Sequence, residues 1–194
     1  SIGMIGVSRG VDTDQNIDIK TNCYVNNISV ICRRGYAGGL CSWIRGTTID
    51  GCQALSSSVK GSLAQCWHAG GISGYMRNSV IKNSDVTLTK DSNYSLYTNQ
   101  KDCNSGGIVG YVTDECSILN CRANVELMYQ GTSAKEGHRG WIAGYVDTGA
   151  SLTINKCGLG GTYGNTTPSI TLTDSNYSDY IYGSDSPGTV TVGT

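Results

Sequence analysis

Apolar and polar residues alternate over short stretches along most of the chain, which is the period-2 pattern of half-buried β-strands. The clearest stretch has the sequence GGISGYM and begins at residue 70. Alternation predicts one face with Ile72, Gly74 and Met76 and an opposite face with Ser73 and Tyr75. No segment of useful length has apolar residues at i, i+3, i+4 and i+7, so we expect almost no helix.

The GGISGYM stretch is one copy of a repeat. Its strong copies begin at residues 38, 70, 106 and 140, that is, 32, 36 and 34 residues apart, and a fainter copy begins 36 residues before the first of them, at Ile2. Each copy is followed by a second signature, an apolar residue and then an Asn-like residue with Cys or Ser. The examples are residues 19–23, 49–52, 81–84, 118–121 and 154–157. A third alternating strand follows in several repeats, at residues 86–89, 125–127 and 170–173.

A unit with about three short strands cannot bury its own apolar face and must stack on copies of itself. We therefore predict an all-β fold, a parallel β-solenoid of about five rungs with 32–36 residues each, over residues 1–159, followed by terminal strands and an assembly tail at 160–194. Paired glycines would form tight corners with positive φ, and Gly74, Gly110 and Gly144 would keep the interior narrow. The predicted walls consist of Leu40, Ile72, Ile108 and Ile142, then Ile44, Met76, Val112 and Val146, and finally Ile49, Ile81, Ile118 and Ile154.

Composition and charge narrow the function classes. The formal charge of −1 gives no electrostatic basis for binding nucleic acid or acidic membranes. No stretch approaches the roughly 18 apolar residues of a membrane span, so we expect no membrane insertion. Ser1 already lies next to the fainter repeat copy, which leads us to expect a piece of a longer protein.

Nine cysteines without a CxxC pair argue against a zinc ribbon and favour an oxidising compartment. The column after the Asn-like position reads Cys23, Cys52, Ser84, Cys121, Cys157. If successive repeats stack, the serine separates two adjacent pairs, Cys23 with Cys52 and Cys121 with Cys157, at a spacing of about 4.8 Å. These are either two disulfides between rungs or buried thiols. Cys32, Cys66 and Cys103 each precede a glycine pair and could link neighbouring loops, whereas Cys41 and Cys116 fit no column.

Two further patterns are candidate modification or ion sites. Four sequons place glycosylation candidates at Asn27, Asn93, Asn165 and Asn176, and glycosylation there would need a eukaryotic secretory origin. Asp12, Asp14, Asn16 and Asp18 have the alternate spacing of a calcium loop. Ile17 stands where such a loop needs glycine, and no suitably spaced glutamate follows, so a polar turn is the competing interpretation.

An aromatic column is the main surface hypothesis. Trp43, Tyr75, Tyr111 and Tyr145 occupy one position of the repeat, opposite the aliphatic wall, and would stand about 4.8 Å apart. They form either a strip that binds sugars or a partner, or a second small core covered by a loop of each repeat. His68 and His138 share another column two rungs apart, at about 9 to 10 Å, which is too far to ligate one metal ion. No cofactor is expected.

The strings GG[IL]xGY[VIM], followed by Ile and then Asn-Cys, resemble the GLUG-motif repeats of large bacterial surface proteins, including IgA-peptidase-like proteins and predicted adhesins. The resemblance covers about residues 2–157. It implies a secreted or surface-attached β-solenoid that serves as a stalk or adhesin, and it supplies no catalytic residues. The cysteine content departs from that pattern.

The sequence predicts a non-enzymatic, extracellular or cell-surface structural module of an adhesin, stalk or filament. Self-association end to end, or contact with neighbouring domains, is expected because a solenoid without caps ends in open strand edges. The tail contains a strand at residues 189–192 that could join a neighbour. The alternatives are a glycan-binding module, which needs an exposed aromatic column, and a carbohydrate-active β-helix, which needs converging carboxylates and cations.

Overall fold

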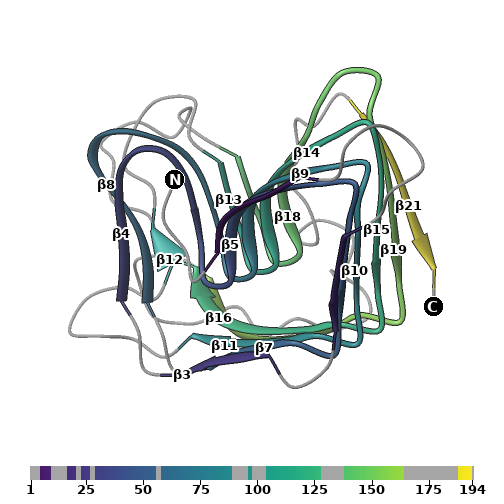
Figure 1. The fold of residues 1–194 in the computed structure, drawn as a ribbon, viewed down its shortest axis with the longest axis horizontal. Coiled ribbons are helices and arrows are strands. Elements are labelled where there is room, and N and C mark those ends of the chain that lie inside the picture. Colours follow the sequence, from purple (N-terminus) through teal and green to yellow (C-terminus); the bar gives the residue numbers. More distant parts are fainter. Residues whose placement is uncertain are drawn as a thin grey trace.

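The computed structural model describes residues 5–9, 17–20, 23–26, 29–55, 58–88, 96–97, 104–127, 138–163 and 188–193. Within these ranges every regular element is a β-strand and every strand pairing is parallel. Successive coils lie one behind another and follow nearly the same path (Figure 1). The predicted parallel β-solenoid is confirmed.

The first sheet contains the second half of each GGISGYM-like stretch. Its five strands stand in repeat order, because each coil adds one strand beside the equivalent strand of the coil before it. They are β1 (Ile5–Arg9), β5 (Cys41–Arg45), β9 (Ser73–Arg77), β14 (Val109–Thr113) and β18 (Ala143–Val146).

The second sheet contains the isoleucine of the second signature. It has six strands in sequence order, namely β2 (Ile17–Lys20), β6 (Thr47–Asp50), β10 (Val80–Lys82), β15 (Glu115–Leu119), β19 (Ser151–Asn155) and β21 (Thr189–Gly193).

The third sheet has ten strands and two parts. One part closes the core opposite the first two sheets and contains β3 (Tyr24–Asn26), β7 (Gln53–Leu55), β11 (Asp85–Leu88), β16 (Arg122–Leu127) and β20 (Gly158–Tyr163). The other part leads back to the first sheet and contains β4 (Ser29–Gly38), β8 (Ser58–Gly70), β12 (Leu96–Tyr97), β13 (Asn104–Gly106) and β17 (Arg139–Gly140). We call residues 36–38, 68–70, 104–106 and 138–140 the arm; they are the last residues of β4 and β8, all of β13, and β17 with the residue before it.

The register of the second sheet stacks the isoleucines directly over one another. The pairing runs from coil to coil through Ile19, Ile49, Ile81, Ile118, Ile154 and Val192. The four middle isoleucines have no exposed surface, whereas Val192, at the end of the column, is 40% exposed. Burying one such side chain contributes about 1.5–3 kcal/mol, so this column is a main source of stability.

The two other predicted walls are also buried. Backbone hydrogen bonds link Leu40, Ile72 and Ile108 to the next coil, for example from Ile72 N to Ile108 O at 2.9 Å. Every member of these walls is at most 1% exposed: Leu40, Ile72, Ile108, Ile142, Ile44, Met76, Val112 and Val146.

The structure corrects the predicted roles of the glycines. None of the paired glycines is among the positive-φ residues, so corner conformation is not why they are needed. A Cβ on Gly70 would instead overlap the carbonyl oxygen of Ser73. Nor does Gly74 narrow the core, because a Cβ there would lie 2.7 Å from both N and O of Ala37 in the arm. Strict alternation fails at this point, and Gly74 lets the arm backbone pack directly on the first sheet.

The tail strand has a place in the coil stack. β21 pairs with β19 of the same chain and adds a sixth layer to the second sheet. Val190 and Val192 are spaced like Leu152 and Ile154 and stack on them, which explains why the strand docks in this register. β20 crosses the predicted boundary at residues 159 and 160.

Candidate functional site

The predicted aromatic column is present and in register. Trp43 pairs with Tyr75, Tyr75 with Tyr111, and Tyr111 with Tyr145 on neighbouring strands of the first sheet. Tyr75 and Tyr111 stack with ring centroids 5.6 Å apart and planes at 16°, and Tyr111 and Tyr145 stack at 5.4 Å and 24°. Trp43 meets Tyr75 edge-on at 5.9 Å.

A second column in the arm packs against the first. Tyr36 pairs with His68 and His68 with Asn104, and a hydrogen bond from His138 N to Asn104 Oδ1 adds His138 in the next coil. The Tyr36 ring lies 5.0 Å from the Tyr75 ring, His68 stacks on Tyr111 at 4.2 Å, and His138 lies 4.5 Å from Tyr145. The two columns therefore form one interlocked aromatic zipper between the arm and the first sheet.

Sequence reasoning found the two histidines but missed Tyr36 and Asn104. All four stand two residues before the leading glycine of a repeat, and that shared position was the available signal. The Asn104 side chain connects the histidine levels, since its Nδ2 lies 3.1 Å from His68 Nδ1 and its Oδ1 accepts a hydrogen bond from His138 N at 3.2 Å.

Neighbouring rings cover the faces of the aromatic rings in the zipper. A sugar stacks on an open aromatic face, but Tyr111 has Tyr75, Tyr145 and His68 against it. The hydroxyls are engaged as well, because Tyr75 Oη lies 2.8 Å from Thr113 Oγ1. Burial, followed by a hydrogen bond to Asp147, raises the pKa of Tyr111 above its ordinary value. This geometry favours the interpretation as a second small core.

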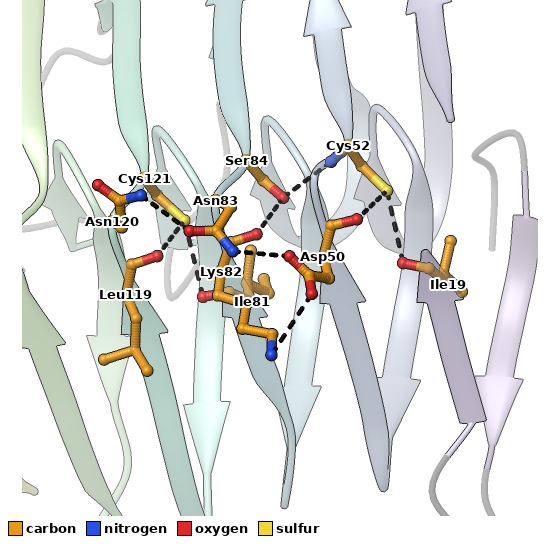
Figure 2. A network of polar contacts seen from close by, with 10 residues as sticks. All are labelled: Ile19, Asp50, Cys52, Ile81, Lys82, Asn83, Ser84, Leu119, Asn120 and Cys121. Atoms are coloured by element: carbon orange, nitrogen blue, oxygen red, sulfur yellow. Dashed lines mark hydrogen bonds and ion pairs between the residues drawn. The ribbon is translucent and has the colours of Figure 1, made fainter. Parts of the chain in front are cut away.

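The cysteine column lies at the corner between the second and third sheets (Figure 2). Backbone hydrogen bonds run along it, from Gln53 N to Cys23 O at 2.9 Å and from Gly158 N to Cys121 O at 2.8 Å. The residue before four of the column members has a left-handed backbone, with φ of 67° at Gly51, 50° at Asn83, 51° at Asn120 and 53° at Lys156. The predicted order Cys23, Cys52, Ser84, Cys121, Cys157 is therefore the order in space.

Ser84 makes the same local hydrogen bond as Cys52, Cys121 and Cys157. Each donates to the carbonyl oxygen two residues earlier, Ser84 Oγ at 2.7 Å, Cys52 Sγ at 3.6 Å, Cys121 Sγ at 3.3 Å and Cys157 Sγ at 3.5 Å. Ser84 Oγ also accepts a hydrogen bond from Cys52 N at 3.1 Å. A hydroxyl thus fits the place of a thiol at this corner.

The cysteine pairs are thiols in this structure and differ in environment. Cys52 and Cys121 are buried, at 0% and 2% exposure, whereas Cys23 and Cys157 are half-buried. Burial and the neighbouring Cys23 raise the pKa of Cys52 to about 11. A hydrogen bond with Cys121 lowers the pKa of Cys157 to about 7, and the same bond together with burial raises the pKa of Cys121.

An amide ladder on the outer side of the corner was not predicted. Asn83 Nδ2 donates to Asp50 Oδ1, and Asn120 Nδ2 donates to Asn83 Oδ1, both at 2.8 Å. Lys82 Nζ completes it with an ion pair to Asp50 Oδ2 at 3.4 Å. Figure 2 shows these side chains passing from coil to coil. The Asn that precedes Ser84 and the Asn that precedes Cys121 were the signal, but their left-handed backbone is visible only in the structure.

The other cysteine candidates are not opposed in the described strands. The register puts Cys32 beside Gly61 and Cys66 beside Gly35, so these two do not face one another, and Cys103 lies outside the described residues. Cys41 and Cys116 are buried, which raises the pKa of each thiol to about 12.

The ion and glycan candidates fall mostly outside the described residues. Asp12, Asp14 and Asn16 do so, and Asp18 is exposed in β2. The four sequon asparagines, Asn27, Asn93, Asn165 and Asn176, also lie outside the described ranges. Within those ranges no group of three or more metal-ligating side chains is present. The same part of the chain has no helix long and apolar enough to cross a membrane.

Comparison with known proteins supports the repeat interpretation. Residues 102–127 match the GLUG motif, a stretch that runs from just before β13 to the end of β16. The motif is found in secreted proteins. No curated protein and no solved structure matches the chain.

Proposed function

Because the chain is a repeat protein that carries the GLUG motif, we propose that it is an extracellular structural module, a segment of a surface stalk, adhesin or filament without catalytic activity of its own. The observation that carries this proposal is the in-register column from Ile19 to Val192. A stack of this kind transmits a load along its axis, because each coil is held to the next by the same backbone and side-chain contacts.

The polar side chains of the described coils support the proposal. The pairs Arg77 with Asp114, at 2.6 Å, and Lys82 with Asp50 each join one cation to one carboxylate on a neighbouring coil. A hydrolase or lyase would need several such groups converging on one substrate. Here the two ion pairs join neighbouring coils and contribute little stability, because water screens them.

Protease treatment of intact source cells tests the location and role. If the chain is part of a surface stalk, mild trypsin should release its peptides from intact cells, and antibodies to it should label the cell surface. A cytosolic marker protein must stay uncleaved as the control. Peptides that appear only after lysis would refute the extracellular role.

Glycan recognition is the second candidate, favoured by one observation. The in-register residues Trp43, Tyr75, Tyr111 and Tyr145 are half-buried, so part of each ring stays exposed along the axis. A glycan array separates the candidates. The structural role predicts no binding above background, whereas a glycan that binds the protein and binds Tyr75→Phe more weakly would establish recognition.

Association between modules is part of the proposal. Among the described strands, β21 has one neighbour, β19, and its other edge can pair with a further copy or an adjoining domain. Light scattering over a concentration series tests this. We expect the mass to rise with concentration and to rise less for Val192→Lys, and a constant monomer mass would rule out self-association.

A further inference from the structure

We propose that Cys157 and Cys121 are a reactive dithiol, in which the half-buried Cys157 attacks an external small-molecule disulfide and the buried Cys121 then closes a disulfide between two neighbouring coils. This site does not depend on the structural role proposed above. The site lies at the corner between the second and third sheets. The different exposure of the two cysteines there determines which sulfur reacts first.

Geometry carries the proposal. The register that pairs Arg122 with Gly158 puts Cys121 directly opposite Cys157 on adjacent parallel segments. Adjacent parallel strands lie about 4.8 Å apart, within the Cα separation that a disulfide tolerates. Both cysteines follow a left-handed residue, Asn120 or Lys156, at the end of a strand, so their side chains leave the same corner in the same way.

The two sulfurs are suited to different steps. Cys157 is accessible, and its hydrogen bond with Cys121 favours its thiolate, which is the attacking species in thiol–disulfide exchange. Cys121 is 2% exposed, and its hydrogen bond with Cys157 together with burial raises the pKa of its thiol. An external disulfide therefore reaches Cys157 first, whereas Cys121 can react only with a sulfur already held at Cys157.

The reaction balances as two exchanges. The Cys157 thiolate attacks one sulfur of the external disulfide, the bond to Cys157 forms, the disulfide bond breaks, and one thiolate leaves. Cys121 then loses its proton to solvent and its sulfur attacks the Cys157 sulfur, which expels the second thiolate. The protein dithiol loses two electrons and two protons, and the external disulfide becomes two thiols.

Ser84 separates this dithiol from the other pair. Cys52 faces Ser84 on one side and Cys23 on the other, so Cys52 has one sulfur neighbour in the column. Cys121 likewise faces Ser84 and Cys157. With serine in the middle, oxidation of the column can give Cys23–Cys52 and Cys121–Cys157 but no crossed pair.

The test uses the full chain, prepared reduced, incubated with glutathione disulfide and mapped by mass spectrometry without reduction. We expect fragmentation to locate a bond between Cys121 and Cys157. In Cys121→Ser, glutathione should accumulate on Cys157, because the second step is blocked. In Cys157→Ser, Cys121 should take up glutathione at least about tenfold more slowly than Cys157 does in Cys121→Ser.

Control variants separate the dithiol reaction from an effect of the substitutions on the fold. Serine is expected to leave the corner intact, because Ser84 occupies the same place with the same hydrogen bond. Cys116→Ala removes a buried thiol outside the column and should change nothing. Ser84→Cys should produce mixed linkages through residue 84. Cys121 and Cys157 that both remain alkylatable in the folded, glutathione-treated protein, or that link elsewhere, would overturn the proposal.

Discussion

Replacing Ile118 by alanine removes the middle of the isoleucine column. Ile118 is fully buried and stacks between Ile81 and Ile154. The substitution deletes the equivalent of 3 methylene groups, and 3 × 0.8 kcal/mol is about 2.4 kcal/mol of lost transfer free energy. The cavity that remains between two stacked coils adds to this loss, so we expect the free energy of unfolding to fall by about 3–4 kcal/mol.

Two positions provide matched controls. Val192 occupies the same column at its end and is 40% exposed, so Val192→Ala deletes 2 carbons that are only partly buried and should cost about 1 kcal/mol. Thr153 is exposed and precedes Ile154 in β19, and Thr153→Ala should change stability by less than about 0.5 kcal/mol.

Urea unfolding, monitored by far-ultraviolet circular dichroism, measures the change in the free energy of unfolding for each of the three variants. Hydrogen exchange should accompany it, because repeat proteins can unfold locally and depart from two-state behaviour. For Ile118→Ala, exchange should accelerate in β10, β15 and β19 together. If Ile118→Ala costs no more than Val192→Ala, the column is not a continuous core and the reasoning is wrong.

Three further predictions concern the arm, the corner and the zipper. Gly110→Ala should lower stability by about 1–3 kcal/mol in thermal unfolding, because its Cβ would lie 2.7 Å from N and O of Ala69, and an unchanged midpoint would contradict the direct packing of the arm. Asn120→Val should destabilise by about 1–2 kcal/mol more than Asn120→Gly in urea titrations, since glycine tolerates the left-handed backbone there and the β-branched valine does not, and equal losses would count against the corner geometry. Burial and Asp147 raise the folded-state pKa of Tyr111 above 10.0. The protonated hydroxyl therefore makes its full contribution to the free energy of unfolding below pH 10, and this contribution is lost as the pH rises further. The stability difference between the wild type and Tyr111→Phe should therefore be constant from pH 7 to pH 9 and shift toward the variant above pH 10, and a pH-independent difference would refute this.

The stacking could be predicted from the sequence because every coil repeats the same burial requirement. A single wall position such as Ile81 indicates little, but the same residue type at equivalent positions of successive repeats leaves few arrangements other than a stack. The order of the cysteine column could be predicted for the same reason, since Ser84 and the four cysteines of the column occupy one repeat position. The aliphatic, cysteine and aromatic columns, each of which occupies one repeat position, were thus located correctly from the sequence.

What escaped the sequence depends on contacts between segments that do not share a repeat position. Gly74 was assigned to the core because alternation was extended through it, whereas the approach of Ala37 in the arm sets its environment. Tyr36 and Asn104 differ in type from the histidines of their column, so they were not recognised as part of it. The left-handed backbone at Asn83 and Asn120, and the amide ladder that it orients, follow from corner geometry that composition does not encode.

Methyl-resolved nuclear magnetic resonance of isoleucine-labelled protein tests the central claim most directly. Single Ile→Val substitutions assign the signals of Ile49, Ile81, Ile118 and Ile154. In-register stacking predicts strong nuclear Overhauser effects between neighbours in that order, from Ile49 to Ile81, Ile81 to Ile118 and Ile118 to Ile154, and none between Ile49 and Ile154. A pattern in which Ile81 and Ile118 show no contact, or in which strands pair antiparallel, would contradict the solenoid.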